Sequence, residues 1–168
     1  MNDQQSDTAT EGPIHAIEQT ESLREIREAL AKARKHLKSI PGDGKPVDRA
    51  RALLDVAELQ LGLGRGGDAW IHAREAFSVF VDYEHWQDAV EAADILYQCD
   101  QPGSIAALGQ GIWLAVTFPV DPELSVTMLN HVVEDTPEDS DGAAVAATTA
   151  LFLIDVRAEG QQKENGFH

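Results

Sequence analysis

The sequence is poor in several features, and each shortage argues against a class of protein. With a single cysteine, Cys99, the chain cannot form an internal disulfide, which indicates a reducing compartment. Only 13 lysines and arginines stand against 29 aspartates and glutamates, so the net charge is 13 − 29 = −16. This balance argues against a nucleic-acid binder, because contacts to phosphates need a basic face.

Membrane and export signals are also missing from the sequence. The first residues carry neither the basic segment nor the apolar segment of a secretory signal. The longest charge-free stretches cover residues 101–120 and 142–154. Proline and glycine interrupt the first, and the second is shorter than the roughly 18–20 residues that a membrane-spanning helix needs. We therefore expect a cytoplasmic protein that binds neither membranes nor nucleic acids.

What the chain does contain fits one domain. Its 168 residues, 43% of them apolar, suffice for a single hydrophobic core. The charge is unevenly distributed: residues 1–20 carry 0 − 4 = −4, residues 21–51 carry 9 − 5 = +4, and residues 52–168 carry 4 − 20 = −16. The polar composition of the ends predicts a disordered acidic tail at 1–20 and a frayed C-terminus at 161–168, which leaves one domain at 21–160.

A regular apolar stripe predicts an amphipathic helix over residues 21–40. Ser22 and Glu25 fit a capping box at its start, and bases fill its C-terminal half, as the helix dipole favours. Two interpretations of the stripe stay open: packing on the helix's own domain, or pairing with a partner or a second copy. Spacings of three and four residues define the stripe, which consists of Leu23, Ile26, Leu30, Ala33, Leu37 and Ile40.

Helical segments separated by short breaks fill the rest of the chain. No segment shows the alternation of a strand together with hairpin turns, so we predict an all-α fold. Helices of this length that are joined by a few residues must reverse direction, which predicts antiparallel hairpins over residues 47–158. The helices are expected at residues 47–63, 67–81, 84–99, 103–118, 122–135 and 140–158.

Residues 50–83 combine apolar and small side chains at helical spacing with a glycine turn. These side chains are Leu53, Val56, Ala57, Ala69, Ala73, Ala76 and Phe77, and the turn is at Gly64. In this pattern the segment resembles a tetratricopeptide repeat, the 34-residue helix–turn–helix unit, although Gln60 replaces the usual aromatic residue of that family. No second clean repeat follows. The resemblance implies a short α-solenoid of about three hairpins, preceded by the amphipathic helix.

The resemblance also implies a binding surface. In the tetratricopeptide family, side chains of the first helix of each hairpin line a groove that holds another polypeptide. Carried over position by position, the residues that line the groove would be Arg51, Leu54, Glu58 and Leu61. The alternative is that the two leucines belong to the core and that the two charged residues are ordinary surface residues.

Two patterns that suggest chemistry have simpler interpretations. The run from Gly62 to Gly67 matches G-x-G-x-x-G, but helix precedes it, so a helix-ending turn is favoured over a phosphate loop. Two His-x-x-Glu pairs could hold a metal together with carboxylates such as Glu58 and Glu91, yet solvated helix faces are favoured in so acidic a chain. These pairs are His72 with Glu75 and His131 with Glu134.

Cys99 and the three tryptophans are expected to serve mainly in packing. The neighbouring Asp100 disfavours a thiolate, so packing at a helix end is favoured over a redox role for Cys99. Trp70 and Trp113 are expected in the core. Trp86 is expected to be exposed and to anchor a partner.

We therefore predict a protein without enzymatic activity or cofactor. The favoured function is an adaptor or assembly chaperone whose acidic helical groove holds a basic or amphipathic segment of a client. Two alternatives remain: a small helical-bundle metal protein or enzyme that uses the His-x-x-Glu pairs, and a structural homodimer. The charge pattern also predicts a clasp between the basic helix 21–40 and the acidic body, within one chain or between subunits. The homodimer would form through Leu23, Ile26, Leu30 and Leu37.

Overall fold

The structure is a computed structural model that describes residues 13–135, with side chains described from Ala16 onward. This part of the chain is all-α, with six helices and no strand, as the sequence predicts. The predictions for 1–12, 140–158 and 161–168 lie outside the described residues. The helices are α1 (Pro13–Ser39), α2 (Pro46–Gly62), α3 (Gly66–Asp82), α4 (Trp86–Gln98), α5 (Ser104–Thr117) and α6 (Pro122–Asp135).

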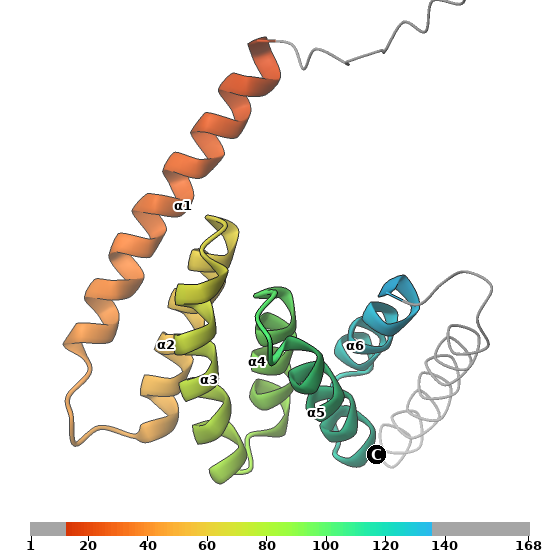
Figure 1. The fold of residues 1–168 in the computed structure, drawn as a ribbon. Coiled ribbons are helices and arrows are strands. Elements are labelled where there is room, and N and C mark those ends of the chain that lie inside the picture. Colours follow the sequence, from red (N-terminus) through yellow and green to blue (C-terminus); the bar gives the residue numbers. More distant parts are fainter. Residues whose placement is uncertain (1–12, 136–168) are drawn as a thin grey trace, which may run out of the picture.

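The helices form a stack of antiparallel hairpins (Figure 1). α2 pairs with α3, α4 pairs with α5, and α6 packs beside α5 and α4. α2 contacts α4 and α4 contacts α6, so these three helices together make one face of the stack. The predicted hairpin architecture is confirmed within residues 46–135, while the predicted partner of α6 at residues 140–158 lies outside the described residues.

Helix α1 begins earlier than the sequence predicts. The capping box places the start at Ser22, but the helix begins at Pro13, and Ser22 lies inside it. Proline suits the first helical position, because a residue there needs no N–H donor. Residues 13–20, which the composition places in a disordered tail, are thus helical.

The C-terminal half of the α1 stripe packs on the chain's own body. Leu30 is buried, Leu37 packs against the core, and Ile26 lies against the end of α2. Toward the N-terminus the stripe becomes exposed: Leu23 is 39% and Ile17 65% exposed, where α1 extends past α2 (Figure 1). Leu30 and Leu37, two of the four residues expected in a homodimer, are therefore already used within the chain.

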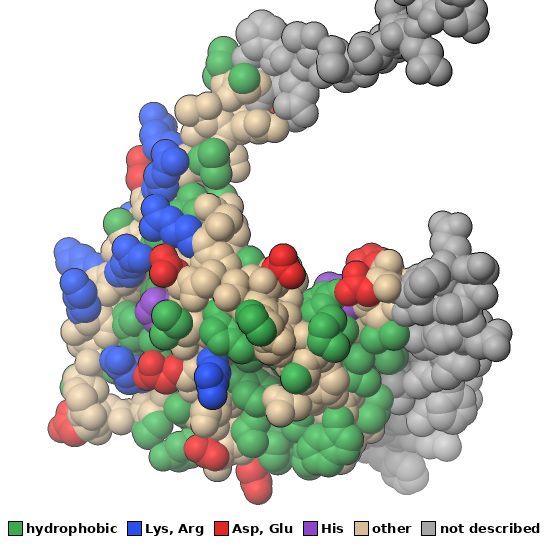
Figure 2. Space-filling view, viewed as in Figure 1, with side chains coloured by type: hydrophobic (Ala, Val, Ile, Leu, Met, Phe, Trp, Pro, Cys, Tyr) green, Lys and Arg blue, Asp and Glu red, His purple; other side chains and the backbone are tan. Residues whose placement is uncertain are grey.

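The bases of α1 face away from the acidic body. Figure 2 shows Lys and Arg side chains gathered over α1 at the left of the molecule. Arg24 pairs with Glu28 of the same helix at 3.8 Å. Within residues 16–135, no ion pair joins a base of α1 to an acid of α2–α6. Apolar packing, rather than the predicted clasp within one chain, holds α1 in place.

Small residues allow the helices of the core to approach closely. Ala57 of α2 and three alanines of α3 are completely buried, each at 0% exposure. Among the described residues, Phe80 near the end of α3 is the largest fully buried side chain, and Met128 of α6 comes next. The three alanines are Ala69, Ala73 and Ala76.

Three successive turns share one backbone conformation. The second residue after the end of α2, α3 and α4 is left-handed, with φ of 70° at Gly64, 58° at Glu84 and 52° at Asp100. In the first two turns, the N–H of the next residue donates to a carbonyl in the last turn of the helix, at 2.9 and 2.8 Å. The glycine run 62–67 is thus a helix-ending turn, and helix α2 precedes it.

Gln60 is a polar exception in the core. It is 1% exposed, and among the described residues its side-chain Oε1 has no hydrogen-bond partner. We expect Gln60→Met, which keeps the length and removes the polar atoms, to raise the free energy of unfolding by about 1–2 kcal/mol. Urea denaturation measures this change. Gln98→Met, the same change at an exposed site, should have little effect, and a less stable Gln60→Met variant would contradict the prediction.

Candidate functional site

The residues predicted for the groove lie together in one hollow between α2 and α4, with a volume of about 280 Å³. All four residues expected from α2 line it. α4 supplies the opposite wall, and one further acid of α2 joins the lining. The wall on α2 consists of Arg51, Leu54, Asp55, Glu58 and Leu61. The wall on α4 consists of Glu91, Asp94, Ile95 and Gln98.

The hollow combines an apolar floor with an acidic rim. Leu54 and Ile95 are buried, at 2% and 8% exposure, and Leu61 is partly buried. Asp55 and Glu58 are exposed on the rim. No base pairs with either of these two acids within residues 16–135. Such a lining suits a segment that presents apolar side chains and bases on one face.

The acids of the rim recur at matching positions of two hairpins. The left-handed turn residues after α2 and α4 are 100 − 64 = 36 residues apart. The same offset relates Asp55 to Glu91 and Glu58 to Asp94. Five residues of the lining were not predicted for the groove from the sequence: Asp55, Glu91, Asp94, Ile95 and Gln98. The 36-residue offset, applied to Glu58, is the signal that would have found Asp94.

Arg51 is tied into the structure by several contacts. Its guanidinium pairs with Asp88 and, at 2.9 Å, with Glu91, both on α4. Gln87 adds a hydrogen bond to Glu91 at 3.2 Å. The guanidinium also lies 5.3 Å from the centre of the Phe80 ring, within cation–π distance. Arg51 therefore joins α2 to α4 at the hollow, and the carboxylates of α4 balance its charge.

A second polar group continues this face from α4 to α6. The Nε2 atom of His131 lies 2.6 Å from Oδ1 of Asp94, and both side chains are more than four-fifths buried, at 17% and 18% exposure. The Tyr97 ring contacts the His131 ring with 4.6 Å between centroids, and its hydroxyl donates to Asp135. These contacts fix the orientation of Asp94 and join α6 to the face made by α2 and α4.

The residues weighed for a metal site are separated by other contacts. The Nδ1 atom of His72 lies 3.0 Å from a backbone carbonyl of its own helix, while Glu75 pairs with Arg49 of α2 at 3.9 Å. His131 contacts α4, and Glu134 is exposed at the end of α6. Within residues 13–135, no three side chains of His, Cys, Asp or Glu gather as a metal ion would need.

Two tryptophans lie in environments opposite to those expected. Trp86, expected to be exposed, is partly buried, and its ring stacks on Phe118 with 3.9 Å between centroids. Trp113, expected in the core, is 59% exposed and meets Phe118 edge-on at 5.9 Å. The chain leaving α5 brings Phe118 onto the start of α4, a contact that no local pattern reveals. Trp86 therefore serves in packing and does not line the hollow.

Cys99 is a buried thiol whose pKa burial raises to about 11 from 9.0. Burial, rather than the neighbouring acid, is the cause. At pH 8 its thiolate fraction is therefore about a hundredfold below that of an ordinary cysteine. We expect iodoacetamide to modify the native protein at least about a hundredfold more slowly than the protein in urea, as measured by mass spectrometry. Equal rates in the two states would contradict this prediction.

Comparisons of the chain with models of known protein families, with curated proteins and with solved structures found no match. None of the helices within residues 13–135 is both long enough and apolar enough to cross a membrane.

Proposed function

We propose that this protein is a non-catalytic interaction module, an adaptor or assembly chaperone, that holds a basic, amphipathic segment of a client protein between α2 and α4. The observation that carries this proposal is the recurrence of acids at matching positions of two hairpins, on both sides of an apolar floor. The resemblance of residues 50–83 to a tetratricopeptide repeat supports the same surface.

The rim and the floor have different tasks in this mechanism. Asp55 and Glu58 attract the bases of the client, which mainly raises the rate of association and its selectivity. Apolar side chains of the client then cover Leu54, Leu61 and Ile95, and this burial supplies most of the affinity. The hollow exists before binding, because helix packing and the Arg51 contacts fix its walls.

The proposal is tested with a synthetic amphipathic helix of lysine and leucine, whose binding to the full chain is followed by fluorescence anisotropy. Replacing Asp55 and Glu58 by lysine changes two exposed acids and so leaves the fold intact. We expect the double variant to bind the peptide about ten- to a hundredfold more weakly, since the rim then repels its bases. Added salt should weaken binding to the parent protein more than binding to the variant.

A matched control separates the groove from the overall charge. Asp43→Lys with Glu84→Lys makes the same charge change at two exposed turn positions outside the hollow. This variant should keep its affinity within about threefold of the parent, because distant exposed charges are screened. If both double variants lose affinity equally, the acids act through net charge alone, and the groove has no role in binding.

A further inference from the structure

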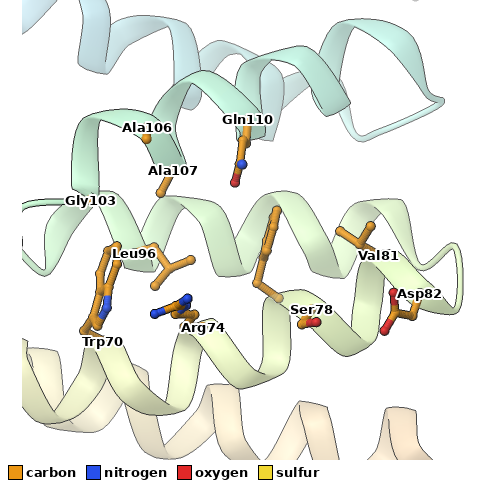
Figure 3. Close-up of a pocket in the computed structure, with 11 residues that line it drawn as sticks. Trp70, Arg74, Ser78, Val81, Asp82, Leu96, Gly103, Ala106, Ala107 and Gln110 are labelled. Carbon is orange, nitrogen blue, oxygen red and sulfur yellow. The ribbon is translucent and has the colours of Figure 1, made fainter.

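A second and larger hollow, of about 610 Å³, lies between α3 and α5. Figure 3 shows Trp70 at one end beside Gly103, with Gln110 reaching into the space from α5 and Asp82 at the far end. Most of its lining is apolar or aromatic, as in sites that bind ligands or peptide side chains. The apolar lining consists of Trp70, Phe77, Val81, Leu96, Ala106 and Ala107.

Helix packing creates this hollow. α3 and α5 both pack on α4, and Leu96 of α4 lines the space between them. Two of the three α5 side chains that line the hollow, Ala106 and Ala107, are small, and Gln110 alone does not fill it. At the end of the hollow, Trp70 packs so closely on Gly103 that a Cβ there would lie 2.8 Å from the indole ring. The walls are therefore fixed by the fold.

Two opposite charges mark the hollow along α3. Arg74 lies on the turn after Trp70, and Asp82 lies at the other end. Among the residues that the structure describes, neither has an ion-pair partner. Their separation of 82 − 74 = 8 helical residues corresponds to about 12 Å. An extended peptide covers this distance with about four residues.

We propose that this hollow docks an extended segment of a partner protein that carries an acid and a base four positions apart with a large apolar residue between them. The acid pairs with Arg74 and the base with Asp82, so the charges fix the direction of the segment. The apolar side chain packs on Leu96. Ser78 and Gln110 offer hydrogen bonds to its backbone.

This docking surface is distinct from the acidic groove between α2 and α4. Leu96 lines the larger hollow, whereas its neighbour Ile95 lines the acidic one, so the two hollows use different sides of α4. Among the described residues, the acidic groove has two acids without an ion-pair partner, Asp55 and Glu58, whereas the larger hollow has one such charge of each sign. The chain can therefore hold two segments of different chemistry at the same time. The proposal for the larger hollow does not depend on the proposal for the acidic groove.

The test uses a nine-residue labelled peptide with blocked ends, in which glutamate, leucine and lysine occupy the third, fifth and seventh positions. Two further peptides carry glutamate, or lysine, at both charged positions. Binding to the full chain is measured by fluorescence anisotropy. We expect the mixed peptide to bind at least about tenfold more tightly than either of the other two, because only it satisfies both Arg74 and Asp82.

Two variants and their controls locate the binding site. Ala106→Trp fills the hollow from an exposed position and should weaken binding of the mixed peptide at least about tenfold. Ile105→Trp, the neighbouring exposed position outside the hollow, should leave the affinity unchanged. Arg74→Glu should transfer the preference to the peptide with two lysines. Arg65→Glu, an exposed arginine outside the hollow, should not.

Several outcomes would overturn the proposal once circular dichroism shows that the variants are folded. One is equal affinity for the three peptides, or no binding of the mixed peptide at millimolar concentration. Another is equal weakening by Ala106→Trp and Ile105→Trp. A dimer that light scattering detects in the parent protein and not in Ala106→Trp would assign the hollow to a second copy of the chain.

Discussion

Phe80→Ala is expected to lower the free energy of unfolding by about 3–5 kcal/mol, the range measured for truncating a buried aromatic side chain. Phe80 is completely buried and is the largest side chain of which this is true in the described residues. Alanine would leave a cavity near the end of α3. It would also remove the ring that lies below the Arg51 guanidinium, and so weaken the connection between α2 and α4.

Urea denaturation followed by circular dichroism measures this loss. Phe80→Leu is the matched control, because leucine keeps most of the apolar volume and should cost less than half as much. Phe77→Ala offers a second comparison, since Phe77 is only partly buried at the edge of the core. A loss below about 1 kcal/mol for Phe80→Ala would mean that the core closes around the missing ring.

Gly111→Ala is expected to destabilise the protein by about 1–3 kcal/mol, although alanine favours helices over glycine by about 1 kcal/mol. A Cβ atom at Gly111 would lie 2.8 Å from the Cβ of Ala93 and would also meet the terminal methyl of Met128. The methionine methyl can turn aside, but the alanine Cβ is fixed to the backbone of α4. The substitution would therefore push α5 away from α4.

The same helix contains a control of opposite sign. Gly109 is exposed, and a Cβ there would meet nothing within 4 Å. Gly109→Ala should therefore raise stability by up to about 1 kcal/mol through helix propensity alone. Thermal and urea denaturation of the two single variants would reveal the difference in sign. If both variants were more stable than the parent, the space between α4 and α5 at Gly111 would accommodate a Cβ atom, which would contradict the prediction.

Local patterns predicted the helices well and their partners poorly. Spacings of three and four residues located α2 to α6 to within a few residues, because apolar periodicity is a property of each segment alone. The burial of Trp86 at the start of α4 depends on Phe118, which follows the end of α5 and is far away in the sequence. The start of α1 was misplaced because a capping box can occur inside a helix when proline begins the helix earlier.

The groove was predicted on α2 and missed on α4 for a specific reason. The first turn contains a glycine, Gly64, which can be recognised in the sequence as the turn position of a repeat. In the corresponding turn of the next hairpin the left-handed residue is Asp100, which carries no glycine signal. Without that marker the 36-residue offset between the hairpins could not be recognised in the sequence. The equivalence of Asp55 to Glu91 and of Glu58 to Asp94 was therefore missed as well.

The length of α1 has a consequence for local stability. Its 27 residues extend about 40 Å, whereas the 17 residues of α2 extend about 26 Å. Around Leu30 the backbone can open only when buried contacts are lost, whereas Ile17 is 65% exposed, so opening there loses little apolar burial. The free energy of local opening therefore decreases along α1 from Leu30 toward Ile17. A contact made at the N-terminal end of α1 would stabilise that end of the helix without disturbing the hairpins.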